Sequence, residues 1–322
     1  MSNFQVYKKT ILFSIVSFLV DLLVLGAMVG LAALGFYLMD AKTDKALIGL
    51  FIGLAVGIVI AAVVKILITN RIKAAQIAMM TMGVTEGSLP ENTFSAGFAE
   101  VKDRFASITL FFMVTGAIKG MFRQIGRAVN RVGTAIGGDT GNAVTSAIDS
   151  AIQTVISYLC DCCLGWVMYR KKEGVAKAAC EGAVIFFKHG KTLIRNIGRI
   201  FGMGLLSLVI VGGGFFGIAY LISKNNPNLY NMLVEEIKEI GVRTESDIPD
   251  FLLNPTYLMY IVSGIVGLIF FSLIHSLLVR PFILVGVLRN FMAAGLKEEI
   301  SEKDFEALDN RSKRFAKLHQ SF

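Results

Sequence analysis

Residues 46–69 read ALIGLFIGLAVGIVIAAVVKILIT, an apolar run with a single charged residue, Lys65. The hydrocarbon core of a bilayer is about 30 Å thick, and a helix needs about 20 apolar residues to cross it. The run is long enough to cross once. It therefore predicts a transmembrane helix and sets the class of the whole chain.

The composition of the whole chain agrees with a membrane protein. Of the 322 residues, 54% are apolar and 17% are charged, whereas a soluble domain carries about 25% charged residues. Three histidines and four cysteines leave little material for a metal enzyme or a disulfide-stapled ectodomain. Because no nucleotide-binding, zinc-protease or nucleophile-elbow motif is present, we expect no enzyme activity, no metal and no cofactor.

Five further apolar runs accompany residues 46–69. We predict an all-α, polytopic transmembrane helix bundle in which residues 1–322 form a single integral membrane domain with interfacial amphipathic helices. The six expected spans are residues 10–39, 46–69, 105–122, 143–169, 200–222 and 257–279. Lys119 weakens the third run, and Asp149 and Asp161 weaken the fourth.

The distribution of charge orients these spans. Residues 170–199 hold eight basic and two acidic side chains, whereas residues 223–256 hold three basic and six acidic ones. Since cytoplasmic segments are rich in Lys and Arg, the first segment is expected inside and the second outside. Both termini are then cytoplasmic in a multi-pass protein of the cell membrane, and the net charge of +8 needs no nucleic acid to explain it.

Two segments outside the spans have amphipathic patterns. In the external loop, Asn226 before Pro227 marks the start of a short helix, whose apolar stripe consists of Leu229, Leu233, Ile237 and Ile240. In the cytoplasmic tail, residues 295–322, Ser301 and Asp304 have the spacing of a capping box. A helix with Phe305, Leu308, Phe315 and Leu318 on its apolar face is expected to follow.

A stripe of cations follows the third run. Its members, at steps of four residues, are Lys119, Arg123, Arg127 and Arg131. If residues 105–169 cross twice, three of these cations face outward and guard one mouth of the bundle. If the segment lies on the inner leaflet, the stripe contacts anionic headgroups. If the third and fourth runs pack together, Asp149 is a possible counterion for Lys119 or Arg123.

Ionisable residues inside a span mark a pathway or a charge pair. Asp21 is expected near mid-bilayer and is a candidate cation ligand, whereas His275 falls near the inner boundary. The consecutive glycines Gly212, Gly213 and Gly214 weaken the fifth span at mid-depth. They serve either as a hinge or pathway, or simply for close helix packing.

The order of features in residues 158–302 resembles the C-terminal half of the choline transporter-like proteins. The shared features are CCLGW at 162–166, LIRN at 193–196, VGGG at 211–214, and a final span that leads into a charged tail at 274–299. The resemblance implies a membrane carrier for an amine or lipid-headgroup compound, although the N-terminal part is too short for that family's usual number of spans.

Three functions follow from these patterns. The first is a transporter or channel-like protein for a small solute. The second is a non-catalytic scaffold or subunit of a membrane assembly, and the third is a lipid-handling protein. The expected partners are membrane lipids with anionic headgroups, and further copies of the chain or other membrane subunits.

Overall fold

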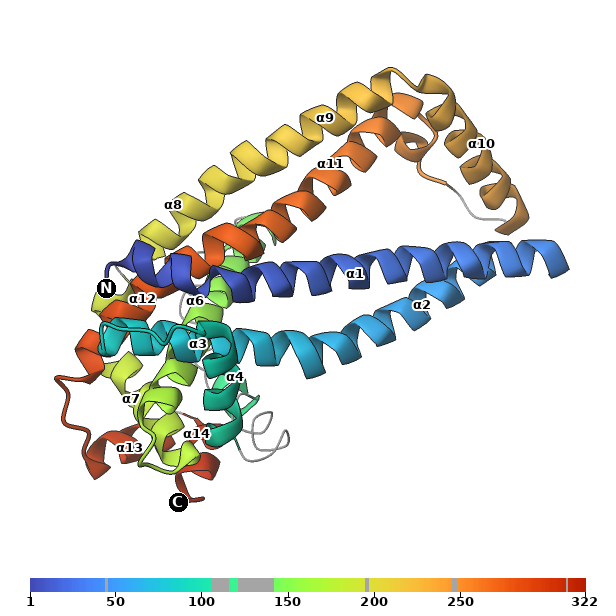
Figure 1. The fold of residues 1–322 in the computed structure, drawn as a ribbon. Coiled ribbons are helices and arrows are strands. Elements are labelled where there is room, and N and C mark those ends of the chain that lie inside the picture. The colour runs from blue at the N-terminus through green and yellow to red at the C-terminus, as the bar shows by residue number, and fades with distance from the viewer. Residues whose placement is uncertain (44–45, 106–115, 121–141, 195–196, 245–247, 311) are drawn as a thin grey trace. The chain divides into compact units, whose positions relative to one another are not determined.

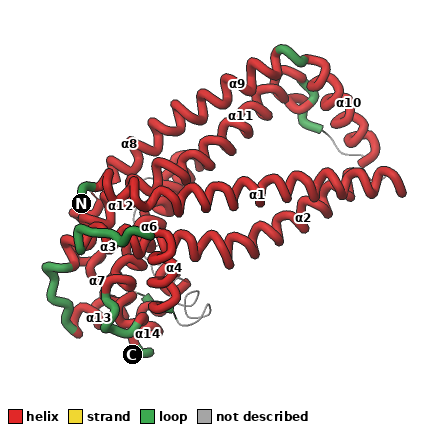
Figure 2. The backbone as a smooth tube through the Cα atoms, viewed as in Figure 1, coloured by secondary structure: helices red, strands yellow, loops and turns green. Residues whose placement is uncertain are grey.

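The computed structural model describes the chain except for residues 44–45, 106–115, 121–141, 195–196, 245–247 and 311. Every regular element in the described part is a helix (Figure 2). Four helices there are long and apolar enough to cross a membrane: Asn3–Met39, Ile48–Thr85, Gly202–Lys224 and Pro255–Gly295. The expectation of a helical membrane protein is confirmed, with four spans accounted for.

The described chain divides into two compact units. Unit 1 comprises Met1–Arg199 and Arg280–Phe322, and unit 2 comprises Ile200–Val279. The chain therefore leaves unit 1 once and returns to it once. The sequence predicts one membrane domain, because hydropathy alone carries no sign of this division.

Unit 1 begins with a hairpin of two long helices, α1 (Asn3–Thr43) and α2 (Ala46–Val64), which pack side by side (Figure 1). Glycines permit the close approach: a Cβ on Gly53 would overlap the Leu31 carbonyl, and one on Gly49 would overlap the Gly35 carbonyl. Most of the remaining surface of both helices is exposed and apolar, as expected where lipid is the solvent.

The rest of unit 1 is a set of packed helices, which we call the body. Its members are α3 (Asn70–Thr85), α4 (Thr93–Arg104), α6 (Asn142–Tyr169), α7 (Val175–Ile194), α12 (Arg280–Gly295), α13 (Glu302–Asp309) and α14 (Lys313–His319). Helix α3 is central and contacts α1, α4, α6 and α12. Its buried Gln76 amide donates to the Thr10 carbonyl at 3.3 Å and to Ser14 Oγ at 2.6 Å, so the start of α1 belongs to the body core.

The C-terminal tail docks onto α7. Lys188 Nζ lies 2.8 Å from both Glu298 Oε1 and Asp304 Oδ2, and Glu298 also pairs with His189. The hydrogen bond from Lys188 holds the pKa of Glu298 below its usual value. Ser301 and Asp304 form the expected capping box. Phe305, Leu308, Phe315 and Leu318 are buried, but they lie on two short helices, α13 and α14, in place of the single helix expected from the sequence.

Unit 2 is built from the second pair of spans and a helix at their far ends. Its elements are α8 (Ile197–Ser207), η2 (Leu208–Gly212), α9 (Gly213–Lys224), α10 (Pro227–Thr244), η3 (Asp250–Leu252), α11 (Pro255–Ile274) and η4 (His275–Val279). Helix α10 starts at Pro227 as predicted. Its inner face carries Tyr230 and Val234, which pack on Leu258, whereas Leu233 of the expected stripe is 38% exposed.

We predict that Gly53→Val destabilises the α1–α2 hairpin and that Gly30→Val does not. A Cβ at Gly53 meets backbone, whereas one at Gly30 has no neighbour within 4 Å among the described residues. Overpacking of this kind costs about 1–3 kcal/mol. Thermal unfolding of both purified variants in the same detergent measures the difference. Equal loss of stability in the two variants would contradict the packing described above.

Candidate functional site

One buried carboxylate joins three helices of the body. Asp161 on α6 is 7% exposed. Its Oδ1 lies 3.0 Å from Lys73 Nζ on α3, and its Oδ2 lies 3.0 Å from Arg280 Nη2 at the start of α12. A buried carboxylate is costly unless it is paired and hydrogen-bonded, and here each oxygen has its own cation. We call Lys73, Asp161 and Arg280 the charge triad.

The face of α6 that carries Asp161 also holds the Arg280 guanidinium. Arg280 Nη2 donates to Ser157 Oγ at 2.7 Å, and the guanidinium carbon lies 5.8 Å from the centroid of the Tyr158 ring. These contacts place Arg280 over one turn of α6. The triad is therefore built into the packing of α6 against α3 and α12.

Three π-helical turns occur in the described spans. They are η1 (Lys65–Thr69), η2 and η4. Turns of this kind are rare and often occur at functional sites. Each of the three adjoins a polar residue: Lys65 begins η1, Ser207 immediately precedes η2, and His275 begins η4.

A hydrogen bond or an electrostatic interaction links these polar residues to the other helix of their own hairpin. In unit 2, Ser207 Oγ lies 3.1 Å from His275 Nδ1. In unit 1, α1 contacts η1, and the positive charge of Lys65 acts on the Asp21 carboxylate. The sequence predicts Asp21 near mid-bilayer. It lies 18 residues from the start of α1 at Asn3 and 22 residues from its end at Thr43, close to the middle of the helix.

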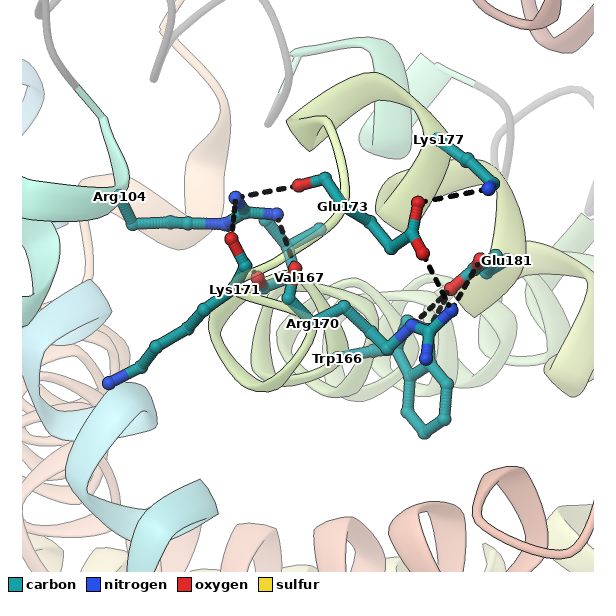
Figure 3. Close-up of polar contacts among 8 residues, drawn as sticks. All are labelled: Arg104, Trp166, Val167, Arg170, Lys171, Glu173, Lys177 and Glu181. Atoms are coloured by element: carbon teal, nitrogen blue, oxygen red, sulfur yellow. Dashed lines mark hydrogen bonds and ion pairs between the residues drawn. The ribbon is translucent and has the colours of Figure 1, made fainter.

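Arg104, at the end of α4, closes the carboxyl end of α6 (Figure 3). Its guanidinium donates to the carbonyls of Val167 at 2.8 Å, Arg170 at 3.0 Å and Glu173 at 2.9 Å. The last carbonyls of a helix have no partner within the helix, so this side chain satisfies groups that would otherwise be unpaired. The turn between α6 and α7 is thereby fixed to α4.

A second buried carboxylate, Glu181 on α7, faces the same turn (Figure 3). It is 4% exposed and accepts hydrogen bonds from Trp166 Nε1 at 3.0 Å and from Arg170 Nε at 2.9 Å. Arg170 also reaches Glu173, which pairs with Lys177. The hydrogen bond from Lys177 holds the pKa of Glu173 below its usual value.

The predicted site residues are distributed over different parts of the chain. Lys119 is exposed and lines a small cavity with Lys73 and Asp161. Gly212 is buried against Phe271 and Gly267 of α11. Gly213 and Gly214 are exposed, and a Cβ added to either would meet no atom of the described residues within 4 Å. Asp149 belongs to α6, but its side chain lies outside the described part of the structure. The last three predicted residues also lie outside the described part: Arg123, Arg127 and Arg131.

The residues that organise the body are not evident from the sequence. The sequence pattern does not single out Lys73, and it identifies Asp161 only as an interruption of an apolar run. An acid inside an apolar run is itself the signal for a buried pair, but its partners lie 88 residues before it and 119 residues after it. Glu181 and Arg104 give no signal, because single charges on amphipathic helices are normally solvated.

Comparisons of the chain with family models, characterised proteins and solved structures found no match.

We predict that Glu181→Gln destabilises the body and that Glu173→Gln leaves its stability almost unchanged. The first variant removes the buried partner of Arg170, at a cost of about 1–3 kcal/mol, whereas the second alters a solvated pair. Trp166 is the chain's single tryptophan and donates to Glu181, so denaturant unfolding followed by its fluorescence reports on this site. A larger loss in the Glu173 variant would show that Glu181 is not the anchor of the network.

Proposed function

We propose that this chain is a multi-pass membrane protein that moves a small solute across the bilayer. One observation carries the proposal: each hairpin has interacting polar residues beside a π-helical turn. Ser207 and His275 share a hydrogen bond in unit 2, whereas Asp21 and Lys65 in unit 1 interact through their charges. Ionisable groups in apolar helices are costly and by default belong to a pathway or a charge pair.

The π-helical turns support the same proposal. A π turn widens the helix and leaves backbone carbonyls less regularly bonded than in an α-helix. Non-helical or irregular backbone at membrane depth is tolerated where it is buried in protein or lines a polar route. No residue of η1 or η4 is buried among the described residues, so the side chains of these turns are accessible to a solute or ion.

The topology that we propose has four spans and two cytoplasmic termini. Phe105 is buried in unit 1, Ile118 is also buried there, and Gly120 lies against the Arg314 side chain of α14. If residues 105–122 crossed the membrane, the two ends of this segment would lie on opposite sides of the bilayer. Both ends lie in unit 1, which disfavours such a crossing. The six spans expected from hydropathy need that crossing.

The charge distribution supports the internal position of the body. The start of α1, the α6–α7 turn and the tail all belong to unit 1, and residues 170–199 carry the basic excess that is typical of cytoplasmic segments. The chain leaves unit 1 at residue 199 and returns to it at residue 280. The two spans of unit 2 therefore bring the chain back to the side of the membrane from which it started.

We predict that a cysteine introduced by Asn130→Cys is labelled from the cytoplasmic side only. In four spans residue 130 stays inside, whereas in six spans it lies outside. A membrane-impermeant maleimide applied to intact cells and then to permeabilised cells distinguishes the two. The four native cysteines are buried, so the parent protein is the background control. Labelling of intact cells would overturn the four-span topology.

We predict that Asp21→Asn lowers uptake into proteoliposomes by about tenfold or more, the effect of losing about 1.4 kcal/mol at the pathway. The probes are labelled choline, ethanolamine, phosphocholine and inorganic phosphate, chosen for the amine and headgroup class that the family resemblance implies. Asp103→Asn, an exposed acid on α4, is the matched control.

Two outcomes would count against transport. Equal uptake by the Asp21 and Asp103 variants would remove Asp21 from the pathway. Uptake no faster than that of empty vesicles for every probe would contradict transport of this solute class and would favour a membrane scaffold, which has no need of a solute route.

A further inference from the structure

A small basic cavity lies beside the charge triad. Its volume is about 50 Å³. The polar lining comes from Asn70 and Lys73 of α3, from Lys119, and from Asp161 of α6. The apolar lining includes Ile77 and Ile118, the second of which is 1% exposed. The cavity is therefore a pocket in the body, with polar groups converging from three segments of the chain.

The charges around this cavity are unbalanced. Lys73, Lys119 and Arg280 are positive, and Asp161 is the acid that pairs with Lys73 and Arg280. The positive charges of Arg280 and Lys119 both act on Lys73. Lys119 has no ion pair within the described ranges. One carboxylate thus faces three cations, and an added anion would reduce their mutual repulsion.

The donors available in the cavity suit an oxyanion. A lysine ammonium has three donor hydrogens, and Lys73 directs one toward Asp161 Oδ1 at 3.0 Å. Lys119 is exposed and brings a second ammonium to the cavity, and Asn70 brings an amide. The Asp161 carboxylate would repel an anion, but both of its oxygens are already neutralised by cations.

The cavity lies at the level of lipid headgroups. The exposed apolar side chains of the second and fourth spans continue to Ile68 and Leu278. Lys73 follows Ile68 by five residues, which is about 7.5 Å along a helix, and Arg280 follows Leu278 by two, which is about 3 Å. The headgroup layer extends about 5–7.5 Å beyond the hydrocarbon. Cations at this depth meet phosphate groups.

We propose that the cavity lined by Lys73, Lys119 and Asn70 binds one phosphate group, presented by an anionic lipid of the inner leaflet or as free phosphate. The small volume excludes a nucleotide and admits a single tetrahedral anion. The site is independent of the solute route proposed above, because neither Asp21 nor His275 lines it. Failure of transport would therefore leave it unaffected.

The test measures binding with the full-length protein purified in detergent. Thermal unfolding is followed with added inorganic phosphate, with dioleoyl phosphatidic acid, and with dioleoyl phosphatidylcholine in mixed micelles, all at one ionic strength. Lys119→Gln removes an exposed ammonium of the cavity, and Lys102→Gln removes an exposed ammonium of α4 as the matched control. Lys73→Met is a second cavity variant.

We expect phosphate or phosphatidic acid to raise the unfolding temperature and phosphatidylcholine to leave it unchanged. Lys119→Gln should weaken the binding by about threefold to tenfold, the effect of one partly exposed charge-assisted contact. Lys102→Gln should bind like the parent. Because Lys119 is exposed, its variant is expected to fold even if the Lys73 variant does not.

The two anions separate the sources of the phosphate group. A response to phosphatidic acid alone assigns the site to a lipid, and a response to inorganic phosphate assigns it to the free anion. No response to either, or the same affinity in the Lys119 and Lys102 variants, would overturn the proposal.

Discussion

The body depends on the ion pairs that the Asp161 carboxylate forms with Lys73 and Arg280. Removing a carboxylate from water is favourable only if cations and donors replace the lost hydration, and Asp161 obtains them from Lys73 and Arg280. Those cations lie on α3 and α12, the direct continuations of the second and fourth spans. The same contact that neutralises one buried charge therefore joins the continuations of two membrane helices.

The lengths of these two helices explain why they need a packed set of helices outside the membrane. The segments Ile48–Thr85 and Pro255–Gly295 have 38 and 41 residues, or about 57 and 62 Å of helix, against a hydrocarbon core of about 30 Å. About half of each must lie outside the lipid, where its apolar face needs protein to cover it. Helices α4, α6 and α7 supply that cover. The π-helical turns η1 and η4 lie between the part of each helix that is exposed, where lipid would cover it, and the part that is covered by protein.

The four long spans are predictable from the sequence because a run of apolar residues is a local signal. Hydropathy does not separate helices covered by lipid from helices covered by protein, since it is the same in both. Phe105 and Ile118 belong to an expected span, yet both are buried in the body. The tail is predictable because its caps and apolar stripe are local as well. The charge triad is not, because its members meet only after the chain has folded.

The order of the triad along the chain matters during synthesis. Lys73 is made before Asp161, and Arg280 is made after it. A nascent chain that has reached residue 199 can pair one oxygen of the carboxylate, but the cation for the other oxygen is still to be translated. All of unit 2 is made in the interval. The Asp161 carboxylate therefore gains its second cation only after the second pair of membrane helices has been translated.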